Sequence, residues 1–104
     1  MLKLPTVVNL KHEPYDIYIG RKFKKHGLEL ECSIWHNPFI IGKHGNRKKV
    51  IELYREYILN TPELLERLPE LEGKRLGCFC KPKMCHGDIL VELFETLHIK
   101  GREI

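Results

Sequence analysis

The chain has 104 residues, of which 42% are hydrophobic and 31% charged, and it carries a formal net charge of +4. This balance is typical of a soluble globular protein, and the lack of an internal repeat, a low-complexity tract or a linker predicts a single domain over residues 1–104. No apolar run approaches the length that spans a bilayer, and the first residues do not resemble a secretory signal. We therefore expect a cytoplasmic protein with reduced thiols and no membrane partner.

Positive charge is concentrated in the first half of the chain. Residues 1–50 contain ten Lys and Arg against four Asp and Glu, whereas residues 51–104 contain eight against ten. The basic residues cluster at 21–25 and at 43–49. This asymmetry favours an anionic partner, either a small molecule such as a nucleotide or a nucleic acid. An ordinary solvated lysine-rich surface would show the same pattern.

The first half of the chain predicts short strands separated by loops. The β-branched residues of segment 6–10 favour one strand, and segment 16–20 favours a second, with Ile17 and Ile19 on one face. Apolar and polar residues alternate imperfectly in segment 28–33, which is typical of a weak third strand or of a loop. Segment 35–42 mixes aromatic residues with proline and ends in glycine, which is typical of an ordered loop.

Two helices are predicted in the middle of the chain. Apolar residues recur at helical spacing between about 47 and 59, and Asn46 before them is a suitable N-cap. Thr61 and Pro62 resemble the N-cap and first position of a second, shorter helix, which Pro69 is expected to end.

The last third of the chain predicts a strand followed by a closing helix. Segment 74–80 favours a strand with Leu76, Cys78 and Cys80 on one face, and a helix starting near Gly87 or Asp88 is expected to run until Gly101. The predicted fold class is α/β. We expect a small sheet of three to five strands packed with two to three helices, as a Rossmann-like three-layer or two-layer sandwich.

Three of the four cysteines and one of the six histidines lie within nine residues, in the segment Cys78-Phe79-Cys80-Lys81-Pro82-Lys83-Met84-Cys85-His86. Cys78 and Cys80 would project at the carboxyl end of their strand, where open α/β sheets bind ligands. Thiolates with an imidazole suit zinc, and three or four thiolates, Cys32 included, suit an iron–sulfur cluster. Cys78, Cys80, Cys85 and His86 are therefore predicted metal ligands, although the spacing is not that of a standard zinc finger or ferredoxin.

The same segment also supports catalysis by its side chains. Cys85, His86 and Asp88 are expected at the start of a helix, where the dipole and free amides favour a thiolate or a substrate phosphate. With Cys80 they are the predicted catalytic residues of a hydrolase or transferase that works with or without a metal. Asp88 and His86 could equally cap the helix, and the cysteines could be small buried core residues.

Two further places offer ligand-binding groups. Arg21 follows the end of a predicted strand, beside a glycine, and its planar guanidinium can donate two hydrogen bonds to a phosphate or a carboxylate. An arginine with no role at the protein surface would show the same pattern. The segment Trp35-His36-Asn37-Pro38-Phe39 holds a stacking ring, an amide and an imidazole, which suit a nucleobase or a sugar. The alternative is a structural loop in which the rings of Trp35 and Phe39 cover the hydrophobic core.

These motifs together resemble the DUF4326 family of small domains from bacteria, archaea and their viruses. The resemblance rests on segments 8–10, 18–21, 35–39, 77–82 and 85–88, and it departs from the family pattern at His36, where glycine is usual. It implies that one pocket gathers seven residues: Asn9, Arg21, Asn37, Cys78, Cys80, Cys85 and His86. It implies no reaction.

We expect a protein that binds or processes a nucleotide, nucleobase or related phosphorylated ligand at a Cys/His site. The alternative is a nucleic-acid-binding or interaction module with a structural zinc or iron–sulfur site. A third possibility is a robust domain without chemistry at the cysteines. The pattern assigns no role to Cys32, His12, His36 or His44.

Overall fold

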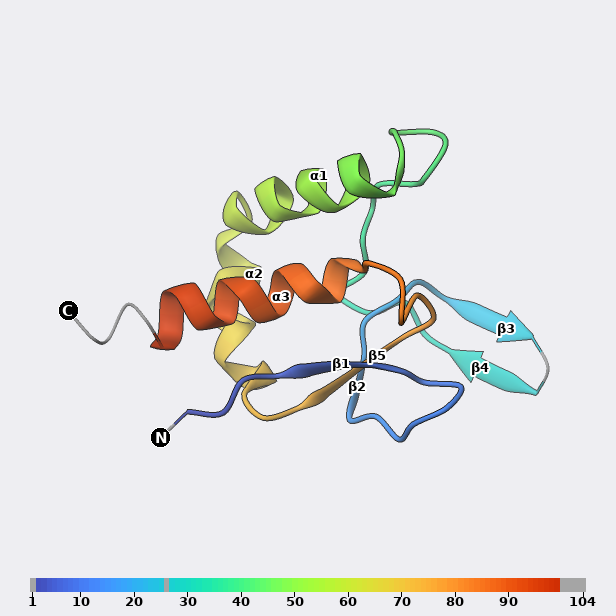
Figure 1. Ribbon diagram of the computed structural model, residues 1–104, viewed down its shortest axis with the longest axis horizontal. Helices are drawn as coiled ribbons and strands as arrows, with labels where there is room; N and C mark the ends of the chain where they lie inside the picture. Colours follow the sequence, from blue (N-terminus) through green and yellow to red (C-terminus); the bar gives the residue numbers. More distant parts are fainter. Residues whose placement is uncertain (1, 26, 100–104) are drawn as a thin grey trace.

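The computed structural model describes residues 2–25 and 27–99, which form a mixed α/β domain (Figure 1). In chain order the elements are β1 (Thr6–Asn9), β2 (Ile17–Tyr18), β3 (Phe23–Lys25), β4 (Leu28–Leu30), α1 (Arg47–Leu59), α2 (Pro62–Arg67), the 3₁₀ turn η1 (Leu68–Leu71), β5 (Arg75–Cys78), α3 (His86–Phe94) and the π turn η2 (Glu95–Ile99). The α/β fold class predicted from the sequence is confirmed. No helix within these residues is both long and apolar enough to cross a bilayer.

The main sheet is parallel, and β5 is its central strand. Its order is β1–β5–β2, with Val8 and Tyr18 both aligned with Gly77 in the register. Leu76 and Cys78 of β5 are buried, as expected of a strand with neighbours on both edges. Because all three strands are parallel, their carboxyl ends meet at one edge of the sheet.

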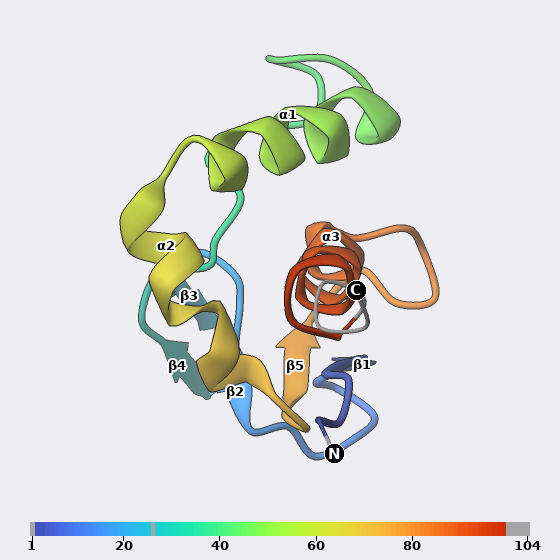
Figure 2. The same ribbon diagram turned by 90° about the vertical axis from the view of Figure 1, so that its left-hand side faces the viewer.

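The helices stack on one side of this sheet. In both ribbon views α3 lies between the sheet and α1 (Figures 1 and 2). Leu90, Leu93 and Phe94 of α3 join Tyr54 and Ile58 of α1 in the hydrophobic core. The burial of this shared apolar surface is the main force that holds the helices on the sheet.

The first helix has the bounds that the sequence predicts. The side chain of Asn46 accepts a hydrogen bond from the amide of Lys49 at 2.9 Å, so Asn46 is the N-cap of α1. The second helix starts at Pro62 as predicted, but Thr61 does not cap it with its side chain. The Thr61 hydroxyl donates instead to the carbonyl of Tyr57, the last turn of α1. Pro69 does not end the helical path, because the chain continues through it as η1.

The end of the last strand and the start of the last helix both differ from the prediction. Strand β5 ends at Cys78 rather than Cys80, because the carbonyl of Cys80 accepts the amide of Lys83 at 2.7 Å and the chain turns there. Helix α3 begins at His86, one residue earlier than expected, with Cys85 as its N-cap. The predicted helix end at Gly101 lies outside the described residues.

A second, two-stranded sheet is the largest departure from the predicted order of elements. Strands β3 and β4 form an antiparallel hairpin that projects beyond the main sheet (Figure 1). The predicted third strand corresponds to β4, which spans only Leu28–Leu30. Strand β3 falls in the basic stretch and was not predicted, because Phe23 is its one apolar residue and gives no alternating pattern.

Candidate functional site

Several element ends converge at one end of the molecule. The carboxyl ends of β1 and β5 and the amino ends of α1 and α3 lie toward the same side, next to the base of the hairpin (Figure 1). A cavity of about 400 Å³ opens there. Its polar lining includes Arg21, Arg47, Cys78, Cys80, Cys85 and His86. This is the edge at which open parallel sheets bind ligands.

The three clustered cysteines come together in this cavity. Cys78, Cys80 and Cys85 all line it, each influences the pKa of the others, and all three are free. Cys78 and Cys85 are 2% and 1% exposed, whereas Cys80 is half-buried. The cluster is therefore most open to solvent at Cys80.

One negative charge is favoured at Cys80. Hydrogen bonds from Cys78 and Cys85, with the nearby guanidinium of Arg47, hold the pKa of Cys80 well below its usual range. The pKa of Cys78 is raised by its bond to Cys80, and that of Cys85 by its bonds to Cys78 and Cys80 and by burial. These opposite shifts favour Cys80 over its two neighbours as the thiol that loses its proton.

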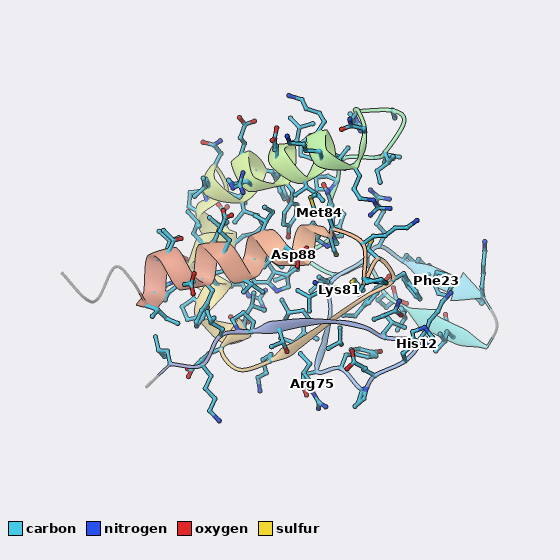
Figure 3. All side chains as sticks on the ribbon, viewed as in Figure 1. His12, Phe23, Arg75, Lys81, Met84 and Asp88 are labelled. Atoms are coloured by element: carbon cyan, nitrogen blue, oxygen red, sulfur yellow. The ribbon has the colours of Figure 1, made fainter. Side chains whose placement is uncertain are left out.

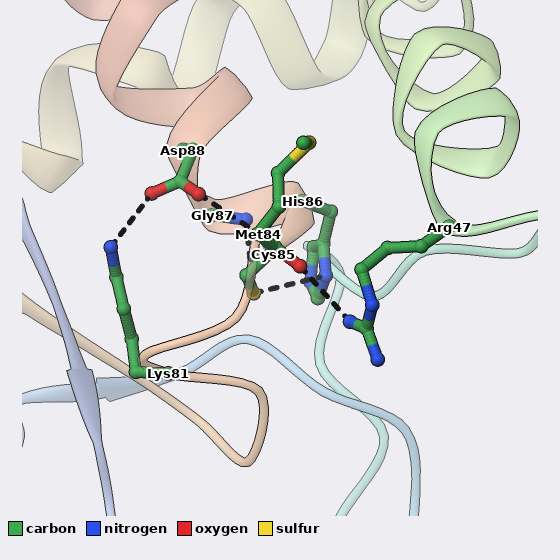
Figure 4. A network of polar contacts seen from close by, with 7 residues as sticks. All are labelled: Arg47, Lys81, Met84, Cys85, His86, Gly87 and Asp88. Carbon is green, nitrogen blue, oxygen red and sulfur yellow. Dashed lines mark hydrogen bonds and ion pairs between the residues drawn. The ribbon is translucent and has the colours of Figure 1, made fainter.

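Cys85 and Asp88 close the first turn of α3 as a capping box. The amide of Gly87 donates to Cys85 Sγ at 3.4 Å, and the amide of Cys85 donates to Asp88 Oδ2 at 3.0 Å (Figure 4). Asp88 Oδ1 also pairs with Lys81 Nζ at 3.2 Å. Lys81, Met84 and Asp88 surround the amino end of α3 (Figure 3). Asp88 therefore has a capping role in this structure, and its predicted catalytic role stays a prediction.

The imidazole of His86 is held in one orientation. Its Nε2 lies 2.7 Å from the carbonyl oxygen of Ile19, and because a carbonyl only accepts, Nε2 carries the proton. Burial lowers the pKa of His86, which favours the neutral ring. Nδ1 is then an acceptor, 3.7 Å from Cys85 Sγ. The ring of Tyr54 packs against this imidazole with a centroid distance of 4.9 Å.

Arg47 is a site residue that sequence reasoning missed. It is the first residue of α1, and its Nη1 donates to the carbonyl of Met84 at 3.0 Å (Figure 4). The same guanidinium also lowers the pKa of Cys80, with which it lines the cavity. The sequence places Arg47 in a basic cluster just after the N-cap Asn46. Only the fold brings Arg47 next to residues 79–85, the loop between β5 and α3 that we call the cysteine loop.

Arg21 and Asn37 line the cavity but also hold its wall together. Nε and Nη2 of Arg21 donate to the Asn37 carbonyl at 3.1 and 2.7 Å, and Nη2 reaches the Phe39 carbonyl at 2.9 Å. The Asn37 side chain donates to the Val50 carbonyl and accepts from the Phe39 amide. These bonds hold the loop before α1 against the end of β2. Ligand binding by either residue stays a prediction.

Asn9 and Trp35 lie outside the described cavity wall. The side chain of Asn9 donates to the Lys81 carbonyl at 2.8 Å and accepts from the Lys11 amide, so it anchors the cysteine loop to β1. Trp35 is 3% exposed in the core, and its carbonyl accepts the hydroxyl of Tyr54 at 2.7 Å. Thus six of the seven residues implied by the family resemblance share one cavity, and Asn9 supports its loop.

The three thiols suit zinc or an iron–sulfur cluster chemically. Within residues 2–25 and 27–99, no group of three or more His, Cys, Asp or Glu side chains is disposed to hold a metal ion. His36 and His44 bond locally, to the Ser33 carbonyl and the Ile40 amide. Cys32 is exposed. A metal at the cysteines therefore stays a prediction.

Comparison with known proteins gives the family. The model described as "Domain of unknown function (DUF4326)" matches residues 6–96. An uncharacterized protein of Acanthamoeba polyphaga mimivirus is 36% identical over 107 residues, covering 89% of this chain and 82% of the relative. An uncharacterized 12.4 kDa protein in the nrdA-td intergenic region of Enterobacteria phage T4 is 34% identical over 100 residues, covering 91% of this chain and 82% of the relative. No solved structure matches. The chain, with its cysteine cluster inside the matched region, therefore belongs to the DUF4326 family.

Proposed function

We propose that this protein binds a nucleotide, nucleobase or related phosphorylated ligand in the cavity and that Cys80 attacks the bound ligand. The observation that carries the proposal is that Arg47 and Cys80 line the same cavity, where the guanidinium lowers the pKa of the Cys80 thiol. A cation and an acidic thiol therefore share the ligand-binding edge of a parallel sheet. A guanidinium suits a phosphate, and a thiolate suits an electrophilic atom of the ligand.

The rest of the lining supports a ligand with a ring and an anionic group. Tyr18, Phe23 and Phe79 form an aromatic wall, in which the Phe23 and Phe79 rings are 4.7 Å apart. Lys22 and Arg47 line the cavity with positive charge. The amino ends of α1 and α3 add positive partial charge at the same end of the molecule (Figure 1).

The side chains define an order of events for the reaction. The anionic sulfur of Cys80 forms a bond to the ligand while the leaving group departs with its electron pair. Nδ1 of His86, held as an acceptor by the Ile19 carbonyl, is then the base that takes a proton from the incoming acceptor. The acceptor bonds to the ligand as the bond to Cys80 breaks, and the sulfur departs with the electron pair as a thiolate. With water as acceptor the protein is a hydrolase, and with a second substrate it is a transferase.

Calorimetric titration with a panel of nucleotides and nucleosides tests the proposal. Arg47→Gln is expected to weaken binding of a phosphorylated compound by about tenfold or more, because a hydrogen bond to a charged group contributes roughly 1.5–3 kcal/mol. Lys48→Gln is the matched control, since this exposed neighbour on α1 removes the same charge outside the cavity. Equal losses in the two variants, or no binding to wild-type protein, would contradict the proposal.

Metal analysis of the same preparation tests the competing use of the thiols. Zinc or iron bound stoichiometrically by the wild type and lost in Cys80→Ser would assign the cluster to a metal. It would remove Cys80 from the nucleophilic role proposed here. Metal-free protein whose Cys80 is alkylated readily at pH 6 would support that role, since an ordinary thiol with a pKa of about 8.5 is mostly protonated there.

A nucleic acid is the second candidate ligand, and one observation favours it. The Nζ atom of Lys11 lies 5.6 Å from the centroid of the Phe79 ring, which also contacts Phe23 beside the lysines of β3. Rings next to cations are the groups on which single-stranded bases stack. A short single-stranded oligonucleotide therefore belongs in the panel. Binding that falls steeply with salt would favour this candidate over a free nucleotide.

A further inference from the structure

Cys80 and Cys85 come from different elements but meet at the cavity. Cys80 follows β5, Cys85 caps α3, and both line the same cavity. Pro82, Lys83 and Met84 between them are exposed, and the chain makes a turn there. A turn of this kind can adjust as two sulfur atoms approach to bonding distance, whereas a packed core segment cannot.

We propose that Cys80 and Cys85 form a dithiol–disulfide redox pair that reduces a small disulfide reaching the cavity. The sulfur of Cys80 attacks one sulfur of the small disulfide, so a mixed disulfide forms and the first small thiolate leaves. Cys85 passes its proton to Nδ1 of His86 and attacks the Cys80 sulfur. The intramolecular disulfide forms, and the second small thiolate leaves with that proton. In total the protein, which starts with Cys80 as a thiolate and Cys85 as a thiol, loses two electrons and one proton. One small disulfide becomes one thiol and one thiolate, and the thiolate takes its proton from the solvent.

The geometry favours Cys85 over Cys78 as the resolving partner. Cys78 is the last residue of β5 and is 2% exposed, and its carbonyl accepts the amide of Leu10 at 3.0 Å, so its backbone is held in the sheet and cannot adjust toward Cys80. Cys85 reaches Cys80 from a separate element, and His86 Nδ1 lies 3.7 Å from its sulfur. The remaining cysteine, Cys32, is exposed and lies outside the cavity lining.

The test uses the wild-type protein, oxidised glutathione as the probe, and no nucleotide. After reaction, free thiols are blocked with iodoacetamide and the protein is cut with trypsin without reduction. Cleavage after Arg75 and Lys83 separates the peptide that holds Cys78 and Cys80 from the peptide that holds Cys85. The expected product is a disulfide between these two peptides, two hydrogen atoms lighter than their sum, and fragmentation spectra identify Cys80 as the partner.

Variants provide the controls. Cys32→Ser should form the cross-linked peptide as the wild type does. Cys85→Ser should lose it and instead accumulate the glutathione mixed disulfide at Cys80, and Cys80→Ser should lose both products. A disulfide within the Cys78–Cys80 peptide, a stable mixed disulfide in the wild type, or no reaction at Cys80 would each overturn the proposal. Because no nucleotide is present, these results do not depend on whether the proposed ligand binds.

Discussion

At the scale of single residues, the site is organised by backbone groups as much as by side chains. The Ile19 carbonyl sets the tautomer of His86, and the Met84 carbonyl holds Arg47 beside the cysteine loop. Since a backbone carbonyl can only accept, the first bond fixes which nitrogen of His86 is protonated, and the second fixes where the guanidinium of Arg47 points. The free Nδ1 of His86 is consequently directed at Cys85 and away from β2.

Asp88 gives a residue-scale prediction that separates capping from catalysis. Asp88→Ala should lower the free energy of unfolding by about 0.5–2 kcal/mol, the usual effect of losing a cap, because the Cys85 amide loses its acceptor. Urea unfolding followed by circular dichroism measures this change. Asp88→Asn is the control, since it keeps an oxygen for the amide and removes the charge that pairs with Lys81. A variant with native stability but no activity would instead support the predicted catalytic role.

At the scale of elements, the cavity depends on how closely α3 approaches the sheet. A Cβ atom on Gly87 would lie 2.8 Å from Ile19 Cδ1 and 3.0 Å from Val7 Cγ2. Glycine in the first turn therefore allows the amino end of α3 to contact both β1 and the residue after β2. This close approach carries Cys85 and His86 to the carboxyl edge of the sheet.

Gly87→Ala should therefore destabilise the protein by about 1–3 kcal/mol, the usual range for overpacking a core. Ile19→Val removes the atom with which the new methyl group collides. The double variant should thus lose less unfolding free energy than the sum of the losses in the two single variants. Urea unfolding of the wild type and all three variants gives this double-mutant cycle. Additive losses would mean that α3 does not pack on Ile19 as described.

At the scale of the whole molecule, the fold joins the two ends of the chain. Strand β1 pairs with β5, and Asp16 just before β2 pairs with Arg75 at the start of β5. Asp16 Oδ2 accepts the Arg75 amide at 2.7 Å and its side chain at 3.1 Å. The hydrogen bonds from Arg75, side chain first, lower the pKa of Asp16 to about 2.

This pair predicts how global stability depends on pH. Because the folded-state pKa of Asp16 is lowered, its stabilising contribution is fully present above its ordinary pKa of about 3.9 and is lost as the pH falls toward 2. Asp16→Asn should melt at a lower temperature than the wild type at pH 5, and the difference should shrink as the pH falls to 2. Thermal unfolding across this range measures it. A difference independent of pH would show that the charge of Asp16 does not contribute.

Local signals in the sequence predicted several elements well. Helix α1 was predicted with its observed bounds because Asn46, the apolar spacing and Thr61-Pro62 are all contained in the segment itself. The segments of β1, β2 and β5 were also predicted as strands, because β-branched residues are visible without a partner, but their parallel pairing was not. Strand β3 was not predicted, because it has no alternating apolar pattern. Its pairing with β4 holds it in a strand conformation.

The sequence by itself determined the α/β class, the main helices, the family and the segment that carries the thiols. Only the tertiary structure decided that Arg47 and Cys80 would line one cavity, that Trp35 would enter the core, and that Asn9 would anchor the cysteine loop. The physical reason is the range of the interactions. Caps and periodicity act over a few residues, whereas the cavity exists because parallel pairing of β1, β5 and β2 brings distant segments to one edge.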